Sequence, residues 1–176
     1  MIVTTIVAVV GAIIMQPLTV SQRVQTRDAN YAAAQQDVRT GVDSMVSQVR
    51  QATSLIYSSG NAIDMNVTLN GTALRVYYEC DIPQPGSLIY RECVRVQAAA
   101  GNSLPSPSTA VVVVRNLLNG TSSNPVFSFG PNPVAPYYMS ATVDVPASGG
   151  ITAFGGLNHT IALSDGALMR NLNVGN

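Results

Sequence analysis

The first twenty residues read MIVTTIVAVVGAIIMQPLTV (residues 1–20), and the first charged side chain after them is Arg23. Twenty helical residues span about 30 Å, which is the thickness of the hydrocarbon core of a bilayer. The stretch therefore predicts a transmembrane or filament-core helix, in which Gly11 lets a neighbouring helix approach closely. Because Pro17 lacks a backbone donor, we expect a kink at that position.

A cleaved signal peptide and a buried core helix are the two other interpretations of this stretch. A signal peptide usually begins with positive charge and ends at a cleavage site of small residues. Here no positive residue precedes the apolar run, and residues 16–18, Gln-Pro-Leu, make a poor cleavage site. A retained helix is therefore the expectation.

The helix is expected to continue through residues 21–58 as its amphipathic half. Gly41 is the only glycine or proline between residues 20 and 56, and a Ser-Ser-Gly-Asn run at 58–61 ends the pattern. Apolar residues recur at steps of three, four or seven, which places them on one stripe of a helix. These residues are Val20, Val24, Tyr31, Ala34, Val38, Val42, Met45, Val49, Ala52 and Ile56.

Residues 61–176 change to short alternating runs separated by turn residues, which is typical of strands. Asn70-Gly71 marks a tight hairpin between two of them. The expected strands lie at 64–68, 73–80, 88–97, 110–115, 127–129, 137–145 and 159–163. Short connections favour antiparallel pairing. The predicted fold class is α+β, a long N-terminal helix whose amphipathic second part packs on an antiparallel β-sheet head.

The two cysteines, Cys80 and Cys93, fall on adjacent predicted strands. An extracytoplasmic head would lie in an oxidising compartment, where a disulfide between them forms. Cys80 shares its strand face with Leu74 and Val76, whereas Cys93 shares its face with Arg91 and Arg95. Simple pairing would therefore put the two sulfurs on opposite sides of the sheet, so the disulfide requires a bulge or an early strand end. Two free thiols are the alternative.

The composition limits the classes of function. Nine arginines balance nine acidic residues, and charged residues make up only 10% of the chain. A neutral balance argues against a nucleic-acid binder, which needs a basic surplus for phosphate contacts. With two cysteines and one histidine we expect neither a cofactor nor a metal site of the Cys/His kind.

Three groups of polar residues are candidate sites, and each has a simpler structural interpretation. Ser164, Asp165 and His159 lie close in sequence, but no nucleophile-elbow pattern accompanies them, so we do not expect an enzyme. Glu79, Asp81 and Glu92 offer carboxylates for Ca²⁺ without a closely spaced ligand loop. Arg75, Arg91 and Arg95 offer a small basic strip for phosphate contacts, but Glu79 and Glu92 are interleaved with them and weaken this signal.

With these features in one order, the sequence resembles the type IV pilins and the pseudopilins of type II secretion, nearest in kind to the PilW-like (GspJ-like) minor pilins. The segments that carry the resemblance are GVDSMVSQVRQA (41–52), VYY (76–78), LIYR (88–91), VRNLLNGT (114–121) and LSDGALMRNLN (163–173). The family's Gly-Phe-Thr-Leu-type start, with a glutamate at the fifth mature position, is not in the sequence. Thr5 stands at that place if Met1 is the mature start, and we expect the missing residues to lie upstream. An atypical pilin-like protein that never had the glutamate is the alternative.

The resemblance implies a structural role. A subunit of a type IV pilus-like or type II secretion-like filament would wait in the cytoplasmic membrane, held by residues 1–20, and then join other pilin subunits in an extracellular filament. Cys80 and Cys93 would form its disulfide, and Gly11 and Pro17 would serve helix packing and extraction.

A membrane-anchored binding head, such as an adhesin, is the alternative function. The loop at 98–108 and the Pro/Gly/Asn-rich stretch at 119–136 are long enough to carry recognition. Tyrosines suited to stacking on a sugar stand at Tyr77, Tyr78, Tyr90, Tyr137 and Tyr138. Tyrosines are also ordinary strand residues, which is the simpler interpretation.

Overall fold

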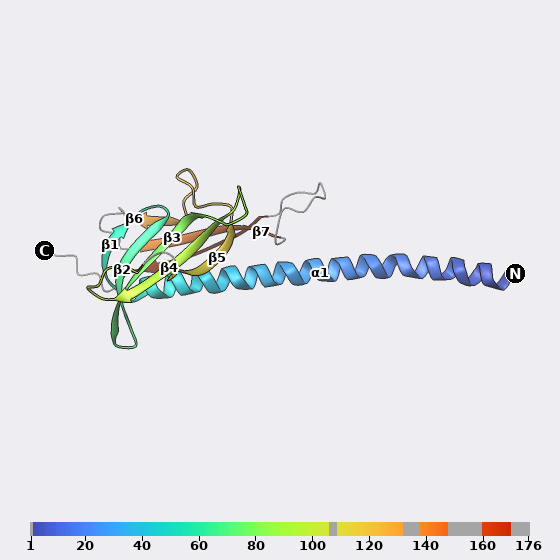
Figure 1. Ribbon diagram of the computed structural model, residues 1–176, viewed down its shortest axis with the longest axis horizontal. Helices are drawn as coiled ribbons and strands as arrows, with labels where there is room; N and C mark the ends of the chain where they lie inside the picture. The colour runs from blue at the N-terminus through green and yellow to red at the C-terminus, as the bar shows by residue number, and fades with distance from the viewer. Residues whose placement is uncertain (1, 106–108, 132–137, 148–159, 170–176) are drawn as a thin grey trace.

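A computed structural model of the chain describes residues 2–105, 109–131, 138–147 and 160–169. Within the helix, side chains are described from Ser21 onward, except at positions 23, 24, 27 and 30. A head of strands sits at one end of a helix, α1 (Ile2–Arg50), that projects far beyond it (Figure 1). The backbone of α1 is helical through Gly11 and Pro17. The close helix packing predicted at Gly11 and the kink predicted at Pro17 stay predictions.

The apolar stripe predicted on the helix is used by the head only along residues 38–50. Val38, Val42, Met45 and Val49 are buried and recur at steps of four, three and four, so one face of the helix meets the head. Tyr31, an earlier member of the predicted stripe, is 40% exposed. Among the described side chains, the earlier members of the stripe are therefore exposed at Tyr31 and half-buried at Ala34.

The amphipathic half of the helix was predicted to run to residue 58, and this is wrong. α1 ends at Arg50, and after Gln51 the chain enters strand β1 (Ala52–Ser58). The residues Thr53, Ile56 and Tyr57 are β-branched or aromatic, which favours a strand. Ala52 is buried and fits the helical and the strand pattern alike, which is why the period alone did not place the boundary.

Five strands form one antiparallel sheet in the order β1-β2-β3-β4-β5. The others are β2 (Ala62–Leu69), β3 (Thr72–Pro83), β4 (Arg91–Ala99) and β5 (Val111–Leu117). Asn70 and Gly71 join β2 to β3 with positive φ angles of 51° and 80°, as a tight primed turn requires. The predicted hairpin is confirmed, and it sets the register in which Asn66 faces Arg75 and Asp64 faces Tyr77.

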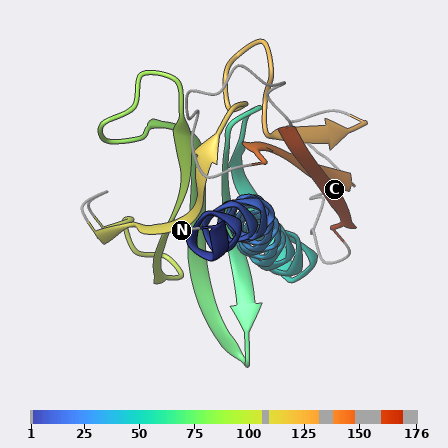
Figure 2. The same cartoon turned by 90° about the vertical axis from the view of Figure 1, so that its right-hand side faces the viewer.

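Three strands form a second antiparallel sheet in the order β6-β7-β8. They are β6 (Phe127–Gly130), β7 (Tyr138–Pro146) and β8 (Thr160–Leu168). Along β7 every second residue, from Met139 to Val145, is buried, so one face of this sheet joins the core. The view along α1 shows the helix lying against both sheets (Figure 2). Buried residues of α1 and of both sheets form a single apolar core.

The buried side chain of Asn119 joins the two sheets. Its amide nitrogen donates to the carbonyl of Thr142 at 2.7 Å, and its oxygen accepts from the amide of Asp144 at 3.1 Å. The amide of Leu118 donates to the carbonyl of Asp144 at 2.8 Å. Asn119 thus occupies the place of a strand partner for β7, where backbone groups would otherwise be buried without hydrogen bonds.

The predicted fold class needs correction. It placed a long helix on a single antiparallel sheet in the manner of pilins, whereas the described chain is mainly antiparallel β, arranged as two sheets. The helix does not pack on a sheet along its length, because the described side chains at 21–37 are exposed or, at Ala34, half-buried. The sequence pattern showed short strands but carried no signal for how they divide between sheets.

The predicted membrane anchor is also corrected. In the part of the chain that the structure describes, no helix combines the length and the apolar character needed to cross a bilayer. The transmembrane assignment of residues 1–20, and the cytoplasmic-membrane location that followed from it, are therefore not supported.

Candidate functional site

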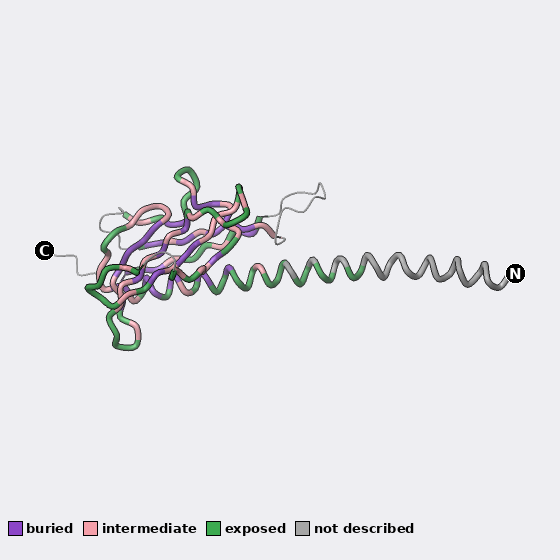
Figure 3. The backbone as a smooth tube through the Cα atoms, viewed as in Figure 1, coloured by how far each residue is buried: buried purple, intermediate pink, exposed green. Residues whose placement is uncertain are grey.

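The described side chains between residues 21 and 37 of α1 are exposed, except the half-buried Ala34 (Figure 3). Between residues 21 and 37 the hydrogen bonds of its described side chains stay within the helix. Thr26 donates to the carbonyl of Gln22 at 2.9 Å, and the amide of Gln35 donates to the hydroxyl of Tyr31 at 3.1 Å. Neither of these hydrogen bonds reaches the head.

The docked end of α1 is fixed by close packing at Gly41. A Cβ atom on Gly41 would lie 2.6 Å from Cγ2 of Val114 and 2.9 Å from the carbonyl oxygen of Val113. Only a glycine therefore lets the helix approach the backbone of β5 this closely. The single glycine in this half of the helix marks the place where the helix meets the sheet.

Buried polar and sulfur contacts lie one and two turns further along the helix. The hydroxyl of Tyr78, a fully buried residue of β3, donates to Oε1 of Gln48 at 2.7 Å. Burial raises the pKa of Tyr78, while Arg95 and Ser44 act in the opposite direction. Sγ of Cys93 lies 3.8 Å from Sδ of Met45. These contacts fix the rotation of α1 about its own axis, because each involves one defined helix position.

The disulfide between Cys80 and Cys93 is present, as predicted. Pairing of β3 with β4 is regular up to Glu79 opposite Val94 and resumes at Ile82 opposite Glu92, so a bulge lies between. The bulge turns Cys80 toward the face that carries Cys93, which resolves the opposite-face problem seen in the sequence. Gly120, with φ of 85°, lies against the carbonyl of Cys80 and leaves no room for a Cβ there.

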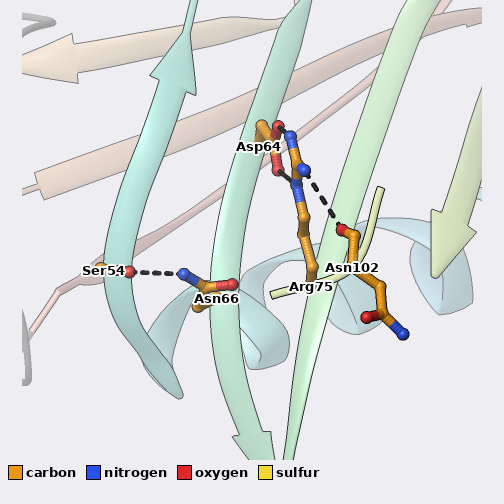
Figure 4. A network of polar contacts seen from close by, with 5 residues as sticks. All are labelled: Ser54, Asp64, Asn66, Arg75 and Asn102. Atoms are coloured by element: carbon orange, nitrogen blue, oxygen red, sulfur yellow. Dashed lines mark hydrogen bonds and ion pairs between the residues drawn. The ribbon is translucent and has the colours of Figure 1, made fainter. Parts of the chain in front are cut away.

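An ion pair crosses the outer face of the larger sheet (Figure 4). Nε and an Nη of Arg75 donate to the two carboxylate oxygens of Asp64 at 3.0 and 2.6 Å. The other Nη donates to the carbonyl of Asn102, at 3.3 Å, and so holds the loop after β4. Asp64 is buried, and a two-point contact of this kind is stronger than a simple charge pair.

A carboxylate-rich patch with a tyrosine lies further along the same strand. Burial, followed by the charges of Glu79 and Asp81, raises the pKa of Tyr77 to about 12. Burial and the charge of Asp81 also raise the pKa of Glu79. Despite this concentration of negative charge, the described residues hold no group of three metal-ligating side chains. The Ca²⁺ interpretation of Glu79, Asp81 and Glu92 gains no support.

A groove of about 580 Å³ opens between α1 and β5. Ala34, Val38 and Gly41 border it from the helix, and Val145 and Pro146 border it from β7. From β5 it is lined by six consecutive residues, 111–116. Arg95 of β4 and Asp37 of α1 are its charged members besides Arg115.

The other predicted groups are not brought together as sites. Ser164 Oγ shares a hydrogen bond with Thr142 Oγ1 at 3.0 Å, and Asp165 lies 3.8 Å from Arg50, while His159 is outside the described residues. Of the basic strip, Arg75 pairs with Asp64 and Arg91 donates to the carbonyl of Asp81 at 2.6 Å. Arg95 lies on the helix side, so the three arginines form no strip.

Two tyrosines of the predicted adhesin, Tyr78 and Tyr138, do not share a surface. Tyr78 is fully buried, whereas Tyr138 of β7 is 43% exposed on the other sheet. Tyr137 lies outside the described residues.

Comparison with family models, with curated proteins and with solved structures found no match for this chain. The resemblance to pilins therefore stays a prediction.

Two of the features above were missed from the sequence. The hairpin at Asn70-Gly71 fixes a register that brings Asp64 and Arg75 within reach diagonally, so counting back from the turn would have found that pair. The groove had no such signal, because it depends on where the second sheet stands relative to β5.

Proposed function

We propose that this chain is a structural subunit of a filament, in which the projecting part of α1 packs against the same helix in other copies. The length of α1 carries the proposal. Its 49 residues correspond to about 73 Å at about 1.5 Å per residue. The head buries the helix only along residues 38–50, about 20 Å of that length. More than half of the helix projects from its own chain (Figure 1).

A projecting helix of this kind needs a partner for physical reasons. Isolated helices are marginal in water, and most helical stability in proteins comes from the packing of an apolar face. Residues 1–20 carry no charge, and residues 21–37 carry the earlier part of the apolar stripe. Equivalent helices from neighbouring copies offer a surface of matching length, and repetition of such a contact extends into a helical filament.

The head supports a structural role by its construction. Its apolar core includes residues from α1 and both sheets, the disulfide links β3 to β4, and Asn119 joins the sheets. Close contacts at Gly41 and the bond from Tyr78 to Gln48 fix the head on the helix in one orientation. A repeating assembly requires such a fixed geometry, because each copy must present the same surfaces to its neighbours.

The experiment compares two substitutions of an apolar residue by aspartate in the full chain. Val10→Asp places a charge in the uncharged part of α1, and Leu88→Asp places one at a fully exposed position of the head. We expect the unmodified chain and Leu88→Asp to sediment as large assemblies and to show filaments by negative-stain electron microscopy. Val10→Asp should sediment as a monomer with an unchanged far-ultraviolet β signal. A monomeric unmodified chain, or filaments of Val10→Asp, would refute the proposal.

A further inference from the structure

The groove between α1 and β5 borders the edge of a strand rather than one face of it. Side chains of a strand alternate between faces, so a space on one face is lined by every second residue. Six consecutive residues of β5, 111–116, line this groove. β5 is also the last strand of its sheet, with β4 as its one strand partner in the described chain. An edge strand of this kind presents a row of backbone donors and acceptors.

The remaining walls give the groove the shape of a slot that is closed at one end. At the closed end, the hydrogen bonds from Leu118 and Asn119 hold β5 against Thr142 and Asp144 of β7. Val111 of β5 and Pro146 of β7 line the groove as well, and α1 forms the floor with Ala34, Val38 and Gly41. A volume of about 580 Å³ lies in the range of about 300–1,000 Å³ that ligand pockets occupy.

The charge in the slot is that of an arginine without a carboxylate partner. Nε of Arg95 is buried, and its N–H donates to no acceptor among the described residues. No described carboxylate lies within ion-pair distance of Arg95, although Asp37 lines the same groove. A second hollow, lined by Gln97, Pro105 and Thr109, meets the groove at Arg95 and Val111. Arg95 is half-buried and its guanidinium also lies beside the hydroxyl of Tyr78. Its unused Nε–H donor still suits a carboxylate, because such pairs are charge-assisted.

We propose that this slot binds an extended peptide segment of another protein, which adds to β5 as a further strand and places a glutamate or aspartate side chain on Arg95. Gly41 of α1 lies against the carbonyl of Val113, and the amide of Asn116 donates to Gln84. Backbone hydrogen bonds to the rest of the β5 edge supply affinity, and the carboxylate and the valine-lined walls supply selectivity. The site is on the head and does not rest on the filament role proposed for α1.

Three synthetic heptapeptides with an N-terminal fluorophore and an amidated C-terminus test the proposal. The first is Val-Thr-Val-Glu-Val-Thr-Val, the second has lysine in place of glutamate, and the third is the glutamate peptide with N-methyl groups on alternate backbone nitrogens. Binding to the full chain is followed by fluorescence anisotropy up to about 1 mM peptide, a range that detects free energies of about −4 kcal/mol or better. We expect the glutamate peptide to bind at least tenfold more tightly than either of the others.

Arg95→Gln and Arg39→Gln are the matched variants, since Arg39 is exposed on α1 and does not line the groove. Arg95→Gln should remove the preference for glutamate over lysine, and Arg39→Gln should keep it. The N-methyl comparison uses the unmodified chain, so it holds even if Arg95→Gln unfolds. Absence of binding, equal binding of the three peptides, or a preference unchanged in Arg95→Gln would overturn the proposal. Self-association of the chain that Arg95→Gln abolishes would assign the slot to a second copy and overturn it as well.

Discussion

Replacing Gly41 by alanine sets helix propensity against packing, and the structure decides which effect is larger. In an exposed helix interior, glycine to alanine stabilises by about 1 kcal/mol. At Gly41 the added Cβ would lie 2.6 Å from Val114 and 2.9 Å from a carbonyl oxygen of β5, which is a backbone atom and cannot move as a side chain does. Overpacking of this kind costs about 1–3 kcal/mol. We therefore expect Gly41→Ala to lower the free energy of unfolding by up to about 2 kcal/mol.

The assay is equilibrium urea unfolding of the full chain, with Ala33→Gly as the reciprocal control. Ala33 is exposed on the projecting part of α1, so Ala33→Gly should lose about 1 kcal/mol through propensity alone. If helix propensity governed both positions, Gly41→Ala would raise the free energy of unfolding by the amount that Ala33→Gly lowers it. A gain of that size at Gly41 would refute the close approach of α1 to β5. Gly41→Val, with a larger side chain, should be less stable than Gly41→Ala.

Three further predictions concern the head. The Cys80–Cys93 disulfide spans 13 residues, and its reduction should lower the free energy of unfolding by about 3 kcal/mol in the chain-entropy model. Urea unfolding with and without reductant measures this difference. A variant with both cysteines replaced by alanine should not respond to reductant. The pKa of Tyr77 is raised from 10 to about 12, so its contribution to stability is fully present below pH 10 and is lost as the pH rises through 12. The free energy of unfolding of Tyr77→Phe, measured in urea, should therefore depend less on pH in this window. Identical pH profiles of the variant and the unmodified chain would contradict this. Arg75→Met should destabilise the chain more than Arg115→Met, because it leaves the buried carboxylate of Asp64 unpaired whereas Arg115 is exposed. Arg75 also donates to the carbonyl of Asn102, so hydrogen exchange near Asn102 should increase in Arg75→Met alone.

Much of the head was predictable from local chemistry. The turn at Asn70-Gly71, the alternation of Val76 and Tyr78, and the continuous β-branched run at 111–114 each depend on a few neighbouring residues, and the structure has strands at all three places. The bulge at Cys80 was required by the face parity of the two cysteines before its geometry was known. These features are specified within a single hairpin or strand.

The features that were not predicted depend on relations between distant segments. The end of α1 at Arg50 is decided by the pairing of residues 52–58 with β2, which competes with a helical period that Ala52 also satisfies. Leu88 and Ile89 were assigned to a strand but are exposed in the connection before β4, since no neighbour covers them. The position of β7 beside the end of β5, which the slot beside Arg95 requires, involves the hydrogen bonds that Asn119 makes with Thr142 and Asp144.

A single residue, Gln51, separates the end of α1 from the first strand. Its carbonyl accepts from the amide of Thr68, and its own amide donates to Gln48, so the connection is short and held at both sides. Tension applied to the N-terminal end of α1 would reach β1 through the covalent chain. It would also reach the smaller sheet through the contacts of α1 with β8. The load is thereby divided between both sheets, and a pull on the rod would not simply peel one edge strand from the domain.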